Sequence, residues 1–463
     1  MKSESCKTSS WRRCGAFVAA TVLVAAGCVG ARATGSPSLS PSIESGASLT
    51  ETPPASATAS PTASPTDAVP VVDLSSVPLA PSGQWKSIKW VHVPAAPLLA
   101  AASGNPDASG IFSDTSNLKV AGWSRGYVGL SMETTTTQLG GDGTTTARAA
   151  YSTDGVHWHA GSVLQQHPST DWMDVRGVYE GPVGLLAVEE SGACGDSWVE
   201  GLLTSRDGIT WQAVDTGKAF GKAVIENVSG GSQGFVATDT NGTKAWTSRD
   251  GRTWQPVNLR SSAFALSRID DGTALSAGYV LAGSTQVTGA RSCGATMADP
   301  SAKPAPTPPL RLPGVWWSAD GTSWVKAQLP GVKAAFPVQM SLCRLDDHTV
   351  IAFDMYNQTT STWAGWVSSD GRTWKTLAQS AGIDPYNYVT DGRHGIELRL
   401  LDPSAGDVYA AGRSLLTWTG GTMVALGESG AKPPYDWQTE TAVGPTGLLV
   451  IDAGQVWIGL PSA

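Results

Sequence analysis

The chain has 463 residues and a formal net charge of −8; 41% of its residues are hydrophobic, 15% are charged, and Gly and Trp are frequent. This charge, without a basic stripe that has interleaved aromatic residues, argues against nucleic acid as a partner. The histidines and cysteines show no metal-ligand spacing, and we expect neither a metal ion nor a cofactor.

Residues 1–28 have the pattern of an export signal. An uncharged stretch, Gly15–Gly30, is too short for a comfortable membrane span and follows a basic start that contains Lys2, Lys7, Arg12 and Arg13. Small residues before Cys28 resemble the lipobox of bacterial lipoproteins, in which Cys28 would be lipidated and become the first residue of the mature chain. We therefore expect a protein anchored through this lipid to the outer face of the bacterial cell membrane, with plain secretion as the alternative.

Residues 29–83 consist almost entirely of Ser, Thr, Pro, Ala and Gly with a few acidic residues. Such a segment has too little apolar surface to form a core, and its prolines favour extended stretches. The sequence predicts a disordered tether between the lipid anchor and a folded domain at 84–463.

The folded part contains five copies of the phrase Ser-x-Asp-Gly-x-x-Trp. Asp-Gly favours a tight hairpin turn, the Ser and Asp side chains can accept hydrogen bonds from backbone amides, and the Trp can pack against the neighbouring repeat. A fixed phrase in this number predicts a repeat architecture. The conserved positions of the phrase are Ser152, Asp154 and Trp158; Ser205, Asp207 and Trp211; Ser248, Asp250 and Trp254; Ser318, Asp320 and Trp324; and Ser368, Asp370 and Trp374.

The segments between these phrases have the pattern of short strands separated by Gly, Asp and Ser turns. Each repeat predicts four strands, with the phrase between the third and the fourth, and the Pro-rich residues 290–313 are expected to form a loop insertion. The last unit, Thr439–Pro461, supplies only three strands, and Gln84–Val93 is expected to complete it and close the ring. The sequence thus predicts an all-β propeller of four-stranded blades, seven in number, with six or eight as alternatives.

The repeated phrase resembles the Asp-box of sialidase-type (BNR repeat) β-propellers, although all five copies are one residue shorter than the usual Ser-x-Asp-x-Gly-x-Thr-Trp. The resemblance implies that the boxes lie on outer hairpins, away from an active site, and hold blades together. Sialidases also carry an Arg-Ile-Pro-like motif, three carboxylate-binding arginines, a Tyr–Glu pair and an acidic residue. Nothing here matches that motif, and the nearest string, Arg311–Pro313, lies in the predicted insertion.

A possible ligand site is predicted on the first strand of each blade, which lines the central channel of a propeller. Alignment of the repeats places there, as candidate channel-lining residues, Lys119, Arg176, Glu226, Arg268, Arg344 and Arg399. Converging guanidinium groups suit a carboxylate, phosphate or sulfate. The alternative is that each arginine pairs with an acid of its own or the next blade. No catalytic residue can be assigned.

These observations favour a non-catalytic scaffold that binds a glycan, an anionic small molecule or a protein. The alternative is a sialidase-like exo-glycosidase with a divergent active site. An exported location also permits one disulfide among Cys194, Cys293 and Cys343, and the sequence does not decide the pairing.

Overall fold

The computed structural model describes the propeller region in segments. These are residues 86–103, 118–136, 143–169, 172–193, 196–291, 309–335, 337–354, 364–377, 388–390, 396–400, 413–419, 422–425, 427–430, 433, 440–452 and 455–462. The predicted signal and tether, with Cys28, lie outside these residues, as do Cys194 and Cys293. Cys343 is buried. Because its two candidate partners lie outside the described residues, the disulfide stays a prediction.

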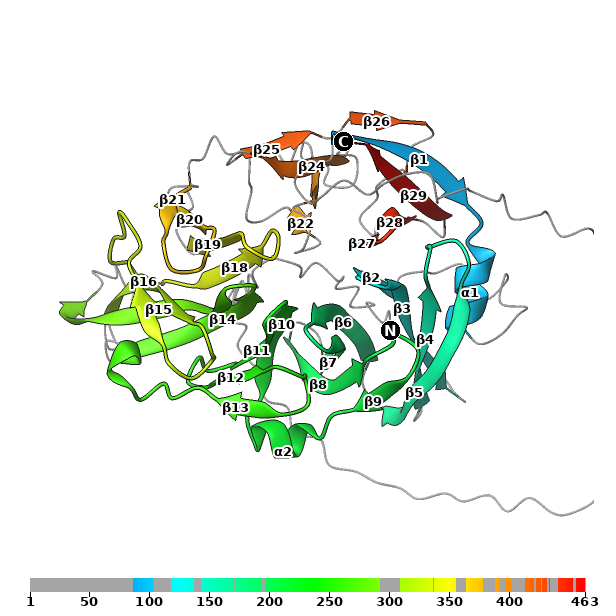
Figure 1. Ribbon diagram of the computed structural model, residues 1–463. Coiled ribbons are helices and arrows are strands. Elements are labelled where there is room, and N and C mark those ends of the chain that lie inside the picture. Colours follow the sequence, from blue (N-terminus) through cyan, green and yellow to red (C-terminus); the bar gives the residue numbers. More distant parts are fainter. Residues whose placement is uncertain are drawn as a thin grey trace, which may run out of the picture. The chain divides into compact units, whose positions relative to one another are not determined.

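The described residues form seven sheets, and Figure 1 shows them arranged in a ring. In six of them four strands follow one another in chain order. The first three sheets comprise β2 (Leu118–Trp123), β3 (Gly126–Thr136), β4 (Gly143–Ser152) and β5 (His159–Ser169); β6 (Trp172–Gly181), β7 (Gly184–Ala193), β8 (Asp196–Ser205) and β9 (Trp211–Ala213); and β10 (Ile225–Gly231), β11 (Gly234–Asp239), β12 (Ala245–Ser248) and β13 (Trp254–Pro256).

The next three sheets comprise β14 (Ser267–Leu275), β15 (Gly278–Arg291), β16 (Pro309–Ser318) and β17 (Val325–Ala327); β18 (Met340–Arg344), β19 (Val350–Asp354), β20 (Ala364–Ser368) and β21 (Lys375–Thr376); and β22 (Tyr388–Thr390), β23 (Ile396–Leu400), β24 (Arg413–Thr419) and β25 (Thr422–Ala425). Short helices lie between strands: α1 (Ala96–Ser103), α2 (Thr216–Phe220) and the 3₁₀ helix η3 (Ser262–Phe264).

The seventh sheet joins the two ends of the propeller. Its strands β27 (Glu440–Gly444), β28 (Gly447–Asp452) and β29 (Gln455–Ser462) are completed by β1 (Ser87–Val93) and by β26 (Gly427–Ser429). β1 pairs antiparallel with β29 along its whole length, from Ser87 opposite Ser462 to Val93 opposite Val456. The predicted all-β fold with seven blades is therefore confirmed, and the described part of the predicted closing segment, β1, completes the seventh sheet.

The hydrophobic core is divided into layers between neighbouring blades. Between the second and third blades, for example, Leu186 and Leu202 pack with Phe235 and Trp254. Equivalent clusters fill the spaces between the first and second, third and fourth, and fourth and fifth blades. Because each strand presents alternate residues to opposite faces, one blade contributes to two of these layers.

The five boxes share one local structure at the turn end of each blade, which is the end where the hairpin between the first two strands also lies. The box serine Oγ accepts a hydrogen bond from the glycine N–H at 2.8–2.9 Å, and the tryptophan Nε1 donates to the glycine carbonyl at 3.0–3.1 Å. In the third box, Asp250 Oδ1 accepts from the amides of Arg252 and Thr253 at 2.8 and 2.7 Å.

The box glycine needs both its positive φ and its missing side chain. Gly251 has φ +73°, and a Cβ there would lie 3.0 Å from Thr204 Cγ2 and 3.2 Å from Leu186 Cδ1 of the preceding blade. Backbone of this conformation favours glycine. Each box therefore brings its blade into close contact with the blade before it.

The ends of the predicted insertion differ from expectation. Residues 290–291 belong to β15 and 309–313 to β16, so the expected loop is in part an extension of a long hairpin, with Arg291 opposite Pro309. β17 pairs only with Val315–Trp317 of β16. On that side of β16, Pro309–Pro313 therefore has no partner strand in β17. Proline is tolerated at such an edge because it has no backbone N–H to donate.

The box tryptophans differ in how deeply they are buried. Trp254 is 8% exposed and packs against Phe220, whereas Trp324 is half-buried. Trp254→Ala is expected to lower the free energy of unfolding by about 3–5 kcal/mol, because it leaves a cavity between two blades. The matched change Trp324→Ala should cost clearly less. Urea unfolding followed by circular dichroism measures both, and equal losses would contradict the packing argument.

Candidate functional site

The first strands β2, β6, β10, β14, β18, β22 and β27 lie nearest the centre of the ring (Figure 1). Five of the six predicted site residues lie on them: Lys119 on β2, Arg176 on β6, Glu226 on β10, Arg268 on β14 and Arg344 on β18. Arg399 does not, because it lies on β23, the second strand of its sheet. Its side chain is outside the part of the chain that the structure describes.

Arg344 lies at the opposite end of its strand from the other four. It pairs with Val350, which pairs in turn with the box serine Ser368, and it is therefore at the turn end. Lys119, Glu226 and Arg268 are the second residues of their strands, at what we call the entry end. Arg176 is the fifth residue of the longer β6 and, like Glu226, comes five residues before the last residue of its strand. The expected single group of channel-lining side chains is thus divided between the two ends.

Three successive first strands carry a β-bulge at the same place. The register shifts at Arg176 on β6, at Glu226 on β10 and at Asp270 on β14. A bulge adds one residue and turns its side chain away from the regular alternation. The bulges therefore set the directions of Arg176 and Asp270 at the entry end.

Polar contacts at the entry end run from blade to blade. Lys119 Nζ contacts Glu440 Oε1 of the seventh blade at 2.7 Å. Arg176 donates to the Glu226 carbonyl and, at 2.7 Å, to Asn227 Oδ1 of the next blade. These residues hold the seventh blade to the first and the second to the third.

The same series continues into the fourth and fifth blades. Asn227 Nδ2 donates to the Asp270 carbonyl at 3.2 Å. Asp270 Oδ2 then accepts from the Met340 amide at 3.1 Å, and Asp271 Oδ2 from the Leu342 amide at 2.8 Å. We call the residues of this series, with Asp174 and Glu190, the entry-end belt.

Each described arginine of the predicted site has an acidic neighbour of its own. Arg176 Nε lies 3.9 Å from Glu190 Oε2, Arg268 Nε 3.1 Å from Asp270 Oδ1, and Arg344 Nη1 3.0 Å from Asp347 Oδ1. The side chains of Arg176 and Arg344 are 7% and 12% exposed, and that of Arg268 is 54% exposed. Each of these three guanidinium groups therefore has an acid in its own blade, and Arg176 also bonds to the next blade.

Three acids of the entry-end belt, Asp174, Asp270 and Asp271, are desolvated. Burial raises the pKa of Asp174 to about 6, although the Lys119 charge opposes this, and Glu190, which lies opposite Asp174 on β7, adds to it. Burial likewise raises the pKa of Asp270 and of Asp271 to about 6, against the amide hydrogen bonds from Met340 and Leu342. Carboxyl groups of this kind exchange protons close to neutral pH.

The raised pKa values predict the pH dependence of stability. An Asp with an ordinary pKa of about 4 in the unfolded chain and about 6 in the fold favours folding most below pH about 4 and loses this contribution as the pH rises through about 6. The box aspartates, such as Asp250, have lowered pKa values because amide hydrogen bonds outweigh burial, so they lower stability only below about pH 4.

We therefore expect the full chain to have a melting temperature at pH 5 that is about 5 °C or more above its value at pH 7.5. Scanning calorimetry measures it. The Asn side chain of Asp271→Asn cannot ionise, so this variant should show a smaller difference in melting temperature between pH 5 and pH 7.5. A melting temperature that stays constant from pH 5 to 7.5 would contradict the desolvation argument.

The sequence interpretation did not single out Asp174, Glu190, Asn227 or Glu440. One signal was available, because Arg176, Glu226 and Asp270 each precede their hairpin glycine by the same number of residues. Within the described segments, no group of three or more His, Cys, Asp or Glu side chains is arranged to hold a metal ion. No helix in the same segments is long and apolar enough to cross a bilayer.

No protein-family model matches the chain, and no curated protein matches it in sequence. Among solved structures, the chain resembles one from the mitotic checkpoint complex with a TM-score of 0.33 and 10% identity, over 75% of this chain and 91% of that one. A gluconolactonase from Xanthomonas campestris gives 0.29 and 14%, over 57% and 79%. A thermostable family-43 glycoside hydrolase gives 0.26 and 9%, over 69% and 96%. Likenesses this distant carry no functional argument, and the β-propeller assignment rests on the sheet topology itself.

Proposed function

We propose that the protein is an extracytoplasmic, membrane-anchored β-propeller lipoprotein that acts as a non-catalytic binding scaffold. This proposal rests on the contacts that the predicted ligand-binding arginines make within the ring. Arg176, Arg268 and Arg344 have acids of their own, and Arg176 also donates to the next blade. Arginines with such partners stabilise the ring rather than form a catalytic pocket, and a partner would then bind to a face of the ring.

The ligand best suited to the entry end is a glycan. The charge of Lys119 is balanced by Glu440, and that of Arg176 by Glu190, so a further anion would gain little there. Asp174, with its pKa of about 6, and Glu440, whose side chain is 13% exposed, can accept hydrogen bonds from hydroxyl groups. Glycan, anionic-ligand and protein partners therefore rank in that order for this end of the ring.

Binding of the full chain to an array of neutral and acidic oligosaccharides tests this choice. We expect neutral glycans to bind and Asp174→Asn to weaken binding at least tenfold. The exposed Glu200→Gln is the matched control and should bind as the unchanged protein does. Binding that both variants retain would place the ligand elsewhere on the ring.

A second candidate function is exo-glycosidase activity, favoured by the pKa of about 6 of Asp174. A general acid in glycoside hydrolysis needs a raised pKa of this kind. Incubation with fluorogenic glycosides between pH 5 and 7 tests it: hydrolysis that disappears in Asp174→Asn, with binding retained, would replace the non-catalytic proposal.

The proposed anchor is tested separately by mass spectrometry of the mature protein. We expect its first residue to be Cys28 with attached acyl chains, and Cys28→Ser to release the protein from the membrane fraction. An unmodified first residue at another position would instead indicate plain secretion.

A further inference from the structure

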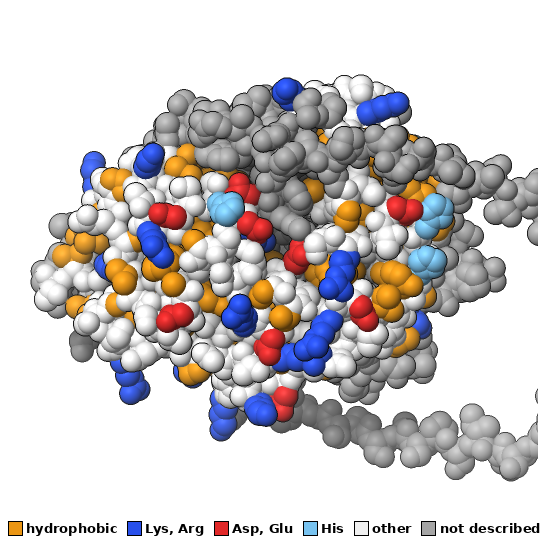
Figure 2. All heavy atoms as spheres, in the orientation of Figure 1, with side chains coloured by type: hydrophobic (Ala, Val, Ile, Leu, Met, Phe, Trp, Pro, Cys, Tyr) orange, Lys and Arg blue, Asp and Glu red, His pale blue; other side chains and the backbone are white. Residues whose placement is uncertain are grey.

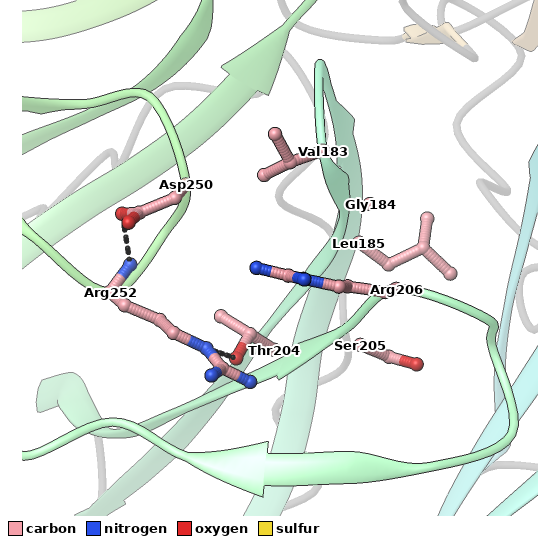
Figure 3. Close-up of a pocket in the computed structure, with 8 residues that line it drawn as sticks. All are labelled: Val183, Gly184, Leu185, Thr204, Ser205, Arg206, Asp250 and Arg252. Atoms are coloured by element: carbon pink, nitrogen blue, oxygen red, sulfur yellow. Dashed lines mark hydrogen bonds between the residues drawn. The ribbon is translucent and has the colours of Figure 1, made fainter.

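A small pocket lies at the turn end, between the second and third blades (Figure 3). It has about 260 Å³ of space, including its mouth, which is open to solvent. Its lining comes from the β6–β7 turn, the end of β8 and the third box: Val183, Gly184, Leu185, Thr204, Ser205, Arg206, Asp250 and Arg252. The pocket is thus a shallow depression of the surface, and a ligand would lie at its mouth.

Positive charge exceeds negative charge in this pocket. Of its two arginines and one aspartate, Asp250 is already fully used by its own turn. Asp250 Oδ1 accepts from two backbone amides and from the Ser248 hydroxyl, and Oδ2 contacts the Thr253 hydroxyl at 3.3 Å. The nearby box aspartate Asp207 is held in the same way by the amides of Ile209 and Thr210.

The Arg206 side chain is exposed and extends into the space between the Val183 turn and the Asp250 loop (Figure 3). The ion pairs found among the described residues do not include it. Arg252 is held differently, since its Nε donates to Thr204 Oγ1 at 2.9 Å and its Nη2 to Gln212 Oε1 at 2.6 Å. One guanidinium is thus fixed at the pocket wall while the other faces its open side.

Two more arginines are close in the structure. Arg125 Nη1 donates to the Arg206 carbonyl at 3.2 Å, and Arg249 directly precedes Asp250 in the third box. Figure 2 shows Lys and Arg side chains gathered over the region that Figure 1 labels β8 and β9. This concentration of positive charge occurs in a chain whose net charge is −8.

We propose that the pocket binds a phosphate group through Arg206, with Arg252 adding to the positive field. A guanidinium presents paired N–H donors that match phosphate oxygens, and an exposed one keeps these donors available. The phosphate would lie at the open mouth of the pocket, and it can be a free ion or the headgroup of an anionic lipid. This proposal uses the turn end and is independent of the glycan site proposed for the entry end.

Titration of the full chain with inorganic phosphate in low-salt buffer, followed by calorimetry, tests the pocket. We expect Arg206→Gln to weaken binding at least tenfold and added sodium chloride to weaken it further. Arg260→Gln is the matched control, because Arg260 is an equally exposed arginine in the turn after β13. Phosphate binding that is absent, or equal in both variants, would overturn the proposal.

Flotation with vesicles distinguishes the two sources of phosphate. One set contains phosphatidylglycerol and the other only phosphatidylcholine, and the test uses chain without the acyl group (Cys28→Ser) so that the lipid anchor does not contribute. Arg206-dependent binding to phosphatidylglycerol vesicles would identify the headgroup as the ligand. Arg206-dependent binding of inorganic phosphate alone would identify a free anion, and Arg206-independent results in both assays would refute the site.

Discussion

Deletion of Lys86–Val93 is expected to destroy the cooperative unfolding of the propeller. This segment contains β1, which pairs with β29 over its whole length and places Ile88, Trp90 and Val93 in the core at 0%, 3% and 1% exposure. Loss of three buried side chains of this size removes about 5–9 kcal/mol of hydrophobic stabilisation, comparable with the whole stability of many domains. It also exposes the edge of β29, which is then open to pairing with other chains.

The experiment compares thermal unfolding and size-exclusion chromatography of two deletions. Removal of Lys86–Val93 should give a broad transition and aggregation, whereas removal of residues 29–83 should leave the melting temperature unchanged. Trp90→Ala is a milder variant that also loses the hydrogen bond from Nε1 to Glu428 Oε1 at 2.8 Å. A sharp, monomeric transition after deletion of β1 would show that the ring does not need this closure.

The boxes and the closure could be predicted because both depend on short-range patterns. The turn chemistry of Ser248, Asp250 and Gly251 lies within a few residues, and it recurs in every copy. The incomplete last blade and the strand-like start of the domain likewise complement each other in the sequence alone. Local regularity of this kind is visible without knowledge of three-dimensional contacts.

The entry-end belt could not be predicted because its contacts cross from one blade to the next. The bulges at Arg176 and Asp270 change side-chain direction, and their equal spacing from the hairpin glycine does not show which residues of the next blade these side chains reach. The position of Arg344 differs from expectation for another reason: Leu345–Thr349, between β18 and β19, is longer than the two-residue hairpin turns of the first four blades, and this shifts the alignment of the strand. The sixth blade has no box, so its sequence has no fixed phrase from which its strands can be aligned with those of the other blades; Arg399 lies on the second strand and not, as the alignment predicts, on the first.

Arg176→Met is expected to lower the free energy of unfolding by about 3–5 kcal/mol at pH 7.5, because it removes one partner from a buried ionic group. Arg176 contacts Glu190 and donates to Asn227, and its charge lowers the pKa of Asp271, which burial has raised. Arg268→Met is the matched comparison and should cost about 1 kcal/mol or less, because Arg268 is 54% exposed. Asp270 then keeps the Met340 amide and the charge of Arg311.

The pH dependence separates this electrostatic effect from simple loss of packing. Without Arg176 the pKa of Asp271 should rise further, so the variant should be destabilised most at pH 7.5, where Asp271 is ionised in the unfolded chain but costly to ionise in the fold. At pH 5 Asp271 is protonated in the fold, and the deficit of Arg176→Met should shrink. Denaturant unfolding at the two pH values measures it. A deficit that is equal at both would mean that Arg176 stabilises the ring through its packed side chain rather than through its charge.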